Sequence, residues 1–398
     1  MRAVIDLRNE TIFMKNITAV EILEKLISYE SVSHRSNLDI ADYIAGLCKG
    51  FGGRVDRFRS PDGQKEALLI AFGPAVPGGV VLSGHMDVVP VTNQTWTSDP
   101  FRLRLADGRL FGRGAVDMKS FLALCLSAAN EMDLARLSRP LYLAFSYDEE
   151  VTCDGVKPIV AFLKAHVPAP SCVIVGEPTE MRIVGAHKGA IDWNIQVHGK
   201  AAHSSLPHLG SNAIHAAARI VQLVEQLAEE FSRSPDPDAA SFDVPFATLS
   251  VGLIKGGSAP NVIASHCELH IEARPLLAGD HAYILERINK LIEGDVLPRL
   301  RRTASEAKVT ISEIDSIPPL VRCALSDAER LVGKLIGSSN VEAVSYATEA
   351  GFFQEVGLPT VVFGPGSISQ AHQPDEFISQ GQFEAGGRFL AQLLRTLY

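Results

Sequence analysis

Several features that would identify other protein classes are missing from this sequence. None of its apolar runs reaches the roughly 18 residues that a membrane-spanning helix needs. The first ten residues, MRAVIDLRNE, carry charges where a secretory signal would need an uninterrupted apolar stretch. Acidic residues outnumber basic ones, 46 against 37, and the densest basic cluster is only Arg299, Arg301 and Arg302. We therefore expect a cytoplasmic protein that binds neither a membrane nor a nucleic acid.

The sequence also lacks the signals of cysteine-based sites, of a serine nucleophile and of a dinucleotide site. The six cysteines form no CxxC pair and lie mostly among apolar neighbours, which is typical of buried free thiols. No GxSxG element marks a serine nucleophile, and no glycine-rich turn has the context of a dinucleotide site. The sequence therefore predicts neither disulfides or cysteine metal ligands, nor a serine nucleophile, nor a dinucleotide site.

The length and the apolar pattern predict an α/β protein with two domains. A chain of 398 residues exceeds what one hydrophobic core usually organises. Short apolar runs such as 67–73 and 79–85 alternate with helical patterns, which favours a mostly parallel sheet covered by helices. Within 188–316 the order of strands and helices fits a split βαβ, ferredoxin-like domain. We expect that domain to be inserted into a catalytic domain of residues 1–187 and 317–398.

Five residues with the side chains that zinc prefers lie at strand ends or in loops bounded by glycine or proline. They are His85 in SGHMDVVP, Asp117 in GRGAVDMKS, Glu150 in YDEEVT, Glu177 in VGEPTE and His372 in QAHQPDEF. Two zinc ions about 3.5 Å apart need a bridging carboxylate and further nitrogen or oxygen ligands at each end. Because functional groups gather at the carboxyl ends of parallel strands, we expect these residues to meet.

Two further carboxylates have expected roles beside the metal. Asp87 forms an HxD pair with His85, so its carboxylate would orient the imidazole through the second ring nitrogen. Glu149 and Glu150 would point to opposite faces if their strand continued, so one would hold metal and the other act as a base. Taken singly, His85 also fits a core or surface histidine, and the acidic triplet fits a solvated turn.

The motifs together are more specific than any of them alone. SGHMDVVP, GRLFGRGAVDMK, the DEE triplet, VGEPT, HGKAAHSS, GGSAPNVI, IEARP and AHQPDEF occur in this order. In this the chain resembles the dinuclear zinc family of aminoacylases, glutamate carboxypeptidases, succinyl-diaminopimelate desuccinylases and acetylornithine deacetylases. The resemblance implies two zinc ions per subunit, with cobalt as a possible substitute; ligands of these types also admit manganese.

The resemblance also assigns roles to residues. It implies that His85, Asp117 and Glu177 hold one zinc and that Asp117, Glu150 and His372 hold the other, with Asp117 bridging. Glu149 matches the general base, and Asp87 matches the carboxylate that orients His85.

The inserted domain matches the lid and dimerisation module of that family. His203 in AAHSS corresponds to a histidine that reaches the active site of a partner subunit and stabilises the oxyanion, which implies a homodimer. Asn261 and Arg274 correspond to residues that hold the substrate carboxylate. From the residues alone, His203 also fits a loop histidine, Asn261 a turn residue and Arg274 a surface ion pair.

The substrate is expected to be an N-acyl amino acid. The segment from 346 to 378 resembles acetylornithine deacetylases, where Glu349 would pair with the side-chain ammonium of N-acetyl-L-ornithine. Glu349 equally fits an acidic residue at a helix start. The expected reaction releases L-ornithine and acetate, as in arginine biosynthesis. The alternatives are another N-acyl amino acid such as succinyl-diaminopimelate, a short peptide, or a metal-binding scaffold without catalysis.

Overall fold

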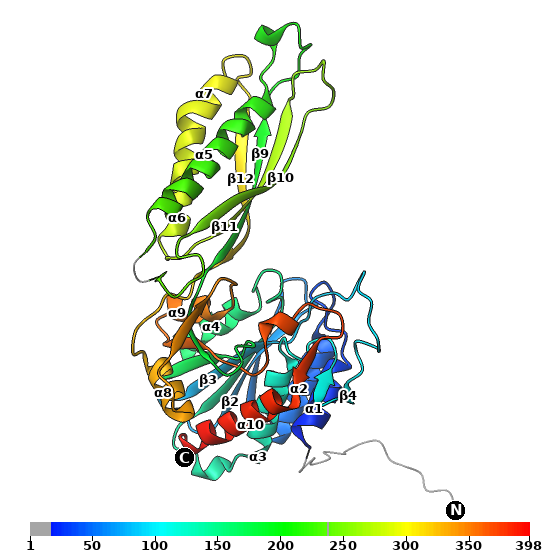
Figure 1. Cartoon of the computed structure of the whole chain (residues 1–398), viewed down its shortest axis with the longest axis vertical. Helices are drawn as coiled ribbons and strands as arrows, with labels where there is room; N and C mark the ends of the chain where they lie inside the picture. Colours follow the sequence, from blue (N-terminus) through cyan, green and yellow to red (C-terminus); the bar gives the residue numbers. More distant parts are fainter. Residues whose placement is uncertain (1–16, 237–238) are drawn as a thin grey trace, which may run out of the picture. The chain divides into compact units, whose positions relative to one another are not determined.

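The computed structural model describes residues 17–236 and 239–398, and its chain divides into two compact units (Figure 1). The first unit runs up to Val184 and also includes Ala324–Val341 and Phe352–Tyr398. The second unit comprises Gly185–Cys323 and Glu342–Gly351. Among the described residues, no helix is long and apolar enough to cross a membrane.

The first unit is built on a sheet whose central strands are parallel. β3 (Val80–His85) pairs in parallel with β6 (Leu141–Ser146) and β7 (Cys172–Val175), and β14 (Thr360–Val362) pairs in parallel with β7. The carboxyl ends of these four strands therefore lie at one edge. The antiparallel strands β2 (Glu66–Phe72) and β1 (Arg54–Arg59) extend the sheet beyond β6. The predicted α/β fold with a mostly parallel sheet is confirmed.

The central strands form because nearly every residue along them is apolar or small and is covered on both faces; the exception is His85 at the end of β3. All residues of β3, β6 and β7 are buried, as expected of a sheet between two layers of helices. On one face lies a common core with α1 (Ala19–Ile27), α2 (Leu38–Gly50), α3 (Lys119–Glu131) and α10 (Gln380–Arg395). On the other face, α4 (Val156–His166) packs against β2 and β6.

Sequence signals explain where several helices of this unit begin and end. Thr18 and Glu21 form a capping box at the start of α1. Ser326 caps α8 (Asp327–Ile336), and Gly337 ends it with a φ of 70°, which favours glycine. The remaining elements of the unit and its boundary are β4 (Arg104–Ala106), β5 (Arg109–Phe111), β8 (Ile183–His187), β13 (Val341–Val344), α9 (Ala350–Glu355) and β15 (Phe377–Ser379).

The second unit has the split βαβ arrangement expected from the sequence. Its four strands lie in the order β10-β11-β9-β12, and all neighbours are antiparallel. The strands are β9 (Ala190–His198), β10 (Thr248–Gly256), β11 (His266–Arg274) and β12 (Lys308–Ile317). Residues of β9 and β11 alternate between buried and half-buried, so one face is apolar.

The helices of the second unit cover that apolar face (Figure 1). They are α5 (Ala213–Arg233), α6 (Asp280–Leu291) and α7 (Leu297–Leu300), the last joined to α6 by a short π-helical segment. The six cysteines are free, as predicted, but Cys323 is exposed rather than buried because it lies in the loop between β12 and α8.

Candidate metal centre and active site

The parallel strand ends of the first unit bring the predicted ligands together. His85 is the last residue of β3, Glu149 and Glu150 follow β6, and Glu177 follows β7 by two residues. Gly84, directly before His85, packs so closely against the Met118 side chain that an added Cβ would lie 2.7 Å from Met118 Cε. Asp117 lies two residues before the start of α3, and His372 lies in the loop after β14.

The His85 imidazole is surrounded by carboxylates. Its Nε2 lies 3.1 Å from Asp117 Oδ1, 3.7 Å from Glu177 Oε1 and 4.0 Å from Glu149 Oε2. His85 is fully buried, and Asp117 and Glu177 are nearly so. Burial lowers the pKa of His85, but the hydrogen bond to Asp117 and the nearby carboxylates outweigh it and hold that pKa well above its usual value.

The other oxygen of Asp117 faces the second histidine. His372 Nε2 lies 3.2 Å from Asp117 Oδ2 and 3.0 Å from Glu150 Oε2. The hydrogen bonds to these two carboxylates raise the pKa of His372 to about 10. Burial raises the pKa of Glu150 to about 7, with the charge of Asp117 adding to the effect. Asp117 thus lies between two imidazoles and gives one oxygen to each.

The spacing of these groups fits metal ligation. Bonds of about 2.1 Å at tetrahedral angles place two ligand atoms of one zinc about 3.4 Å apart. The four distances among the two imidazoles, Asp117, Glu150 and Glu177 run from 3.0 to 3.7 Å. Their ligand atoms form overlapping groups, His85 with Asp117 and Glu150, and His85 with Glu149 and Glu177. An imidazole and carboxylate set of this kind suits Zn²⁺, Co²⁺ or Mn²⁺.

Asp87 supports the site through contacts that differ from the expected one. The ring nitrogen His85 Nδ1 bonds the main-chain carbonyl of Asp87 at 2.9 Å, whereas the Asp87 carboxylate lies 3.7 Å away. That carboxylate instead accepts the backbone N–H groups of Glu149 and Glu150 at 3.2 and 3.4 Å, and the Ser33 hydroxyl at 2.8 Å. Asp87 therefore joins the histidine to the acidic turn.

The acidic turn also has a different geometry from the one assumed for a continuing strand. β6 ends at Ser146, and Asp148 has a φ of 57°, in the left-handed region. The alternation of faces therefore stops before Glu149. As a result Glu149 approaches His85 while Glu150 approaches His372.

Two buried charged residues beside the site, Arg113 and Glu376, were not predicted from the sequence. Each is 1% exposed, and they form an ion pair. Both lie inside motifs already noted, GRGAVDMKS and QAHQPDEF, four residues from a predicted ligand. Charged residues in loops usually face solvent, so nothing in the residue types predicts that these two are buried. The only available signal was their position within those motifs.

In the second unit, two predicted residues come together and a third does not. His203 forms a β-bridge with Val262, and the Asn261 carbonyl accepts the N–H of Ser204 at 3.0 Å. These loops lie before β11, whereas Arg274 is its last residue. A nine-residue strand is about 30 Å long, so Arg274 lies far from His203 and Asn261 within one subunit.

The local contacts of these residues also match their simpler interpretations. Arg274 Nε donates to Glu272 at 2.7 Å, and His203 Nδ1 lies 2.7 Å from the Ser205 hydroxyl. Glu349 is 1% exposed and directly precedes α9, in the second unit. The substrate contacts of Asn261, Arg274 and Glu349 and the oxyanion role of His203 stay predictions.

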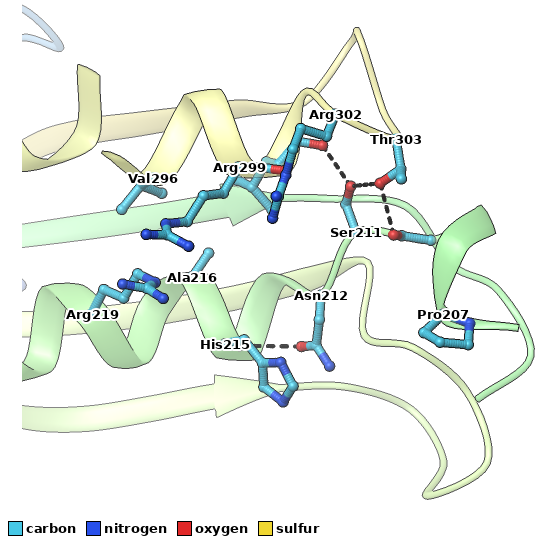
Figure 2. Close-up of a pocket in the computed structure, with 12 residues that line it drawn as sticks. Pro207, Ser211, Asn212, His215, Ala216, Arg219, Val296, Arg299, Arg302 and Thr303 are labelled. Carbon is cyan, nitrogen blue, oxygen red and sulfur yellow. Dashed lines mark hydrogen bonds between the residues drawn. The ribbon is translucent and has the colours of Figure 1, made fainter. Parts of the chain in front are cut away.

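A separate basic hollow of about 470 Å³ lies on the second unit between α5 and α7 (Figure 2). The side chains of Arg219 and Arg299 line it, but both bond Asp295, which compensates their charge. The hydroxyls of Ser211 and Thr303 bond each other and backbone carbonyls in its wall. None of the predicted site residues lines this hollow.

Comparisons with known proteins agree with this fold. The model of the family described as peptidase family M20/M25/M40 matches residues 81–396. A tripeptidase from Staphylococcus aureus is 18% identical with a TM-score of 0.72, over 95% of this chain and 97% of that one. A metallo-carboxypeptidase from Sulfolobus solfataricus is 17% identical with a TM-score of 0.71, over 95% and 98%. A dinuclear metal-binding peptidase from Bacillus subtilis is 14% identical with a TM-score of 0.65, over 95% and 97%.

Proposed function

The chain belongs to peptidase family M20/M25/M40, and we propose that it is a dinuclear zinc amidohydrolase. One observation carries the proposal: Asp117 places its two carboxylate oxygens 3.1 and 3.2 Å from two imidazoles, each of which meets a further carboxylate. In this proposal His85, Asp117 and Glu177 hold one ion, and Asp117, Glu150 and His372 hold the other. The Bacillus subtilis neighbour, named as a dinuclear metal-binding peptidase, supports the same reading.

The residues of the chain divide the chemistry among them. Divalent ions held by the five proposed ligands would supply a Lewis acid for the amide carbonyl and would lower the pKa of bound water. Glu149, within 4.0 Å of His85, takes the proton of the attacking water and delivers it to the leaving amine. Asp87 holds the backbone of Glu149 and orients His85 through its carbonyl.

The proposed substrate is N-acetyl-L-ornithine, cleaved to L-ornithine and acetate. The segment around Glu349 supports this choice through its resemblance to acetylornithine deacetylases, and the buried Glu349 carboxylate would pair with the substrate ammonium. The second candidate is a short peptide, favoured by the names of the Staphylococcus aureus and Sulfolobus solfataricus neighbours. Both reactions use the same attack on an amide carbon.

We further propose that the active site is completed by a second copy of the chain. Arg274 and the pair His203 and Asn261 lie at opposite ends of β11, too far apart to hold one small substrate. A homodimer resolves this if His203 and Asn261 of one subunit meet a substrate held by Arg274 of the other. His203 would then stabilise the oxyanion across the interface.

A substrate panel tests the proposal. The protein is assayed with N-acetyl-L-ornithine, succinyl-diaminopimelate, other N-acetyl amino acids and di- and tripeptides, each with and without a chelator. We expect release of free amine, loss of activity after chelation and recovery with Zn²⁺ or Co²⁺. Preference for peptides would replace the proposed substrate but keep the chemistry. Activity that survives complete metal removal, or no hydrolysis of any amide by the metal-loaded protein, would contradict the proposed function.

A further inference from the structure

A buried ion pair ties together the two loops that carry Asp117 and His372. Arg113 Nη1 donates to Glu376 Oε2 at 2.6 Å, and both side chains are 1% exposed. Arg113 precedes Asp117 by four residues, and Glu376 follows His372 by four. Each partner of the pair therefore belongs to a loop with one proposed ligand.

The carboxylate of Glu376 also fixes the backbone of the first loop. Its Oε2 accepts the N–H of Gly114 at 3.0 Å, and its Oε1 accepts those of Val116 and Asp117 at 2.8 and 3.1 Å. Together with Arg113, four donors converge on two oxygens. A carboxylate can accept from all of them, whereas a neutral amide in its place would turn its N–H groups toward two of these donors.

Arg113 continues the connection to the second loop. Its Nη2 donates to Gln94 Oε1 at 2.6 Å, and Gln94 Nε2 donates to the carbonyl of His372 at 2.8 Å. The backbone N–H of Asp117 and the backbone carbonyl of His372 are thus the two ends of one chain of bonds, through Glu376, Arg113 and Gln94.

The second loop needs such support because its backbone is strained. His372 and Asp375 have φ angles of 62° and 54°, in the left-handed region. Such conformations cost about 1 kcal/mol or more each in residues other than glycine and persist only where surrounding bonds hold them. Asp375 is also held, because its Oδ1 accepts from the N–H and hydroxyl of Thr97 at 3.0 and 2.9 Å.

We propose that Glu376, together with Arg113, is a positioning residue that sets the distance between the Asp117 carboxylate and the His372 imidazole. This distance is 3.2 Å between His372 Nε2 and Asp117 Oδ2. The pair thereby determines the affinity of the metal position formed by Asp117, Glu150 and His372 more than that of the position formed with His85 and Glu177. The inference rests on the ligand assignment of the proposed function.

The test compares Glu376→Gln with a matched control, Glu66→Gln. Glu66 is also buried and also pairs with arginines, Arg57 and Arg59 at 3.0 and 2.7 Å, but it lies in no loop with a proposed ligand. Arg113→Lys is the second variant, since it keeps the charge but cannot reach Glu376 and Gln94 together. Zn²⁺ affinities of metal-free protein are measured by competition with a chromophoric chelator, and the thermal midpoint of the metal-free protein records folding.

We expect E376Q and R113K to weaken one of the two Zn²⁺ affinities roughly 10- to 100-fold, as loss of a ligand's supporting partner usually does. The visible absorption bands of the Co²⁺-loaded protein should shift in these variants and not in E66Q. A purely structural role would lower the thermal midpoint without changing affinity or bands, and that result would overturn the inference. If the wild-type protein does not bind two Zn²⁺ ions, the proposed function fails, and the inference fails with it.

Discussion

Among the residues that the structure describes, each unit contains one fully buried histidine, and the two have opposite acid–base behaviour. His85 in the first unit has its pKa held well above the usual value by Asp117 and other carboxylates. His187 in the second unit has its pKa lowered to about 4, because burial is opposed only by a hydrogen bond to the Lys188 carbonyl. Equal burial therefore gives different chemistry, and the neighbouring charge decides which.

The contrast separates a place that attracts positive charge from one that excludes it. Around His85 the negative charge of the carboxylates favours binding of a cation, either a proton or a metal ion. Around His187, Nε2 has no hydrogen-bond partner among the described residues, so a proton added there would be buried without compensation. The metal centre depends on the carboxylates more than on burial.

Removal of the proposed base should produce the largest effect. Glu149→Gln keeps the size of the side chain but cannot accept a proton, so turnover should fall about 10⁴-fold, the upper end for general-base catalysis. Metal content should stay close to wild type, measured by elemental analysis of the purified variant. Near-normal turnover would remove Glu149 from the mechanism, whereas a loss of bound metal would make it a ligand like its neighbours around His85.

Removal of the exposed His203 side chain should have the next largest effect on turnover. We expect the loss to occur in the active site of the partner subunit. His203→Ala should lower turnover roughly 10²- to 10³-fold, the usual cost of one lost oxyanion donor. Heterodimers of H203A and E149Q subunits, purified through two different tags, distinguish where His203 acts. One of their two sites combines an intact Glu149 with an intact partner His203, so about half of the wild-type turnover per dimer should return.

The mixed dimer has two clear opposite results. If His203 acts within its own subunit, both sites of the heterodimer carry a defect and turnover stays as low as in the single variants. If no heterodimer can be isolated from co-expressed chains, the shared site is contradicted. Arg274 would then need another partner for its side of the substrate, since His203 and Asn261 lie at the far end of β11.

The sequence predicts the strands of the centre better than the periphery. Long apolar runs identify β3, β6 and β7, because strands buried on both faces contain hardly any polar residue. The three-residue strands β4, β5 and β15 escaped prediction, since so short a segment has no measurable periodicity.

In the candidate site, too, the sequence predicts which residues take part but not the contacts between them. His85 and the other proposed ligands could be found because residue type and motif order identify them. The bond from His85 to the Asp87 carbonyl, rather than to its carboxylate, depends on backbone geometry that HxD does not encode. The Arg113 and Glu376 pair joins residues 263 positions apart, so only the folded chain reveals it.

The smallest expected effect is on the free energy of unfolding and concerns His187, the buried histidine of the second unit. His187 binds a proton below pH 4 when folded but at about pH 6.5 when unfolded, so the unfolded state gains protons first as the pH falls. The stability that the neutral ring contributes is complete above about pH 6.5, and about 3 kcal/mol of it is lost by pH 4. In His187→Asn, whose amide can still donate to the Lys188 carbonyl, this loss should disappear. Urea unfolding of wild type, H187N and the exposed-site control H215N between pH 7 and 4 measures it. If the free energy of unfolding changed equally with pH in wild type and H187N, His187 would not be the buried neutral counterpart of His85.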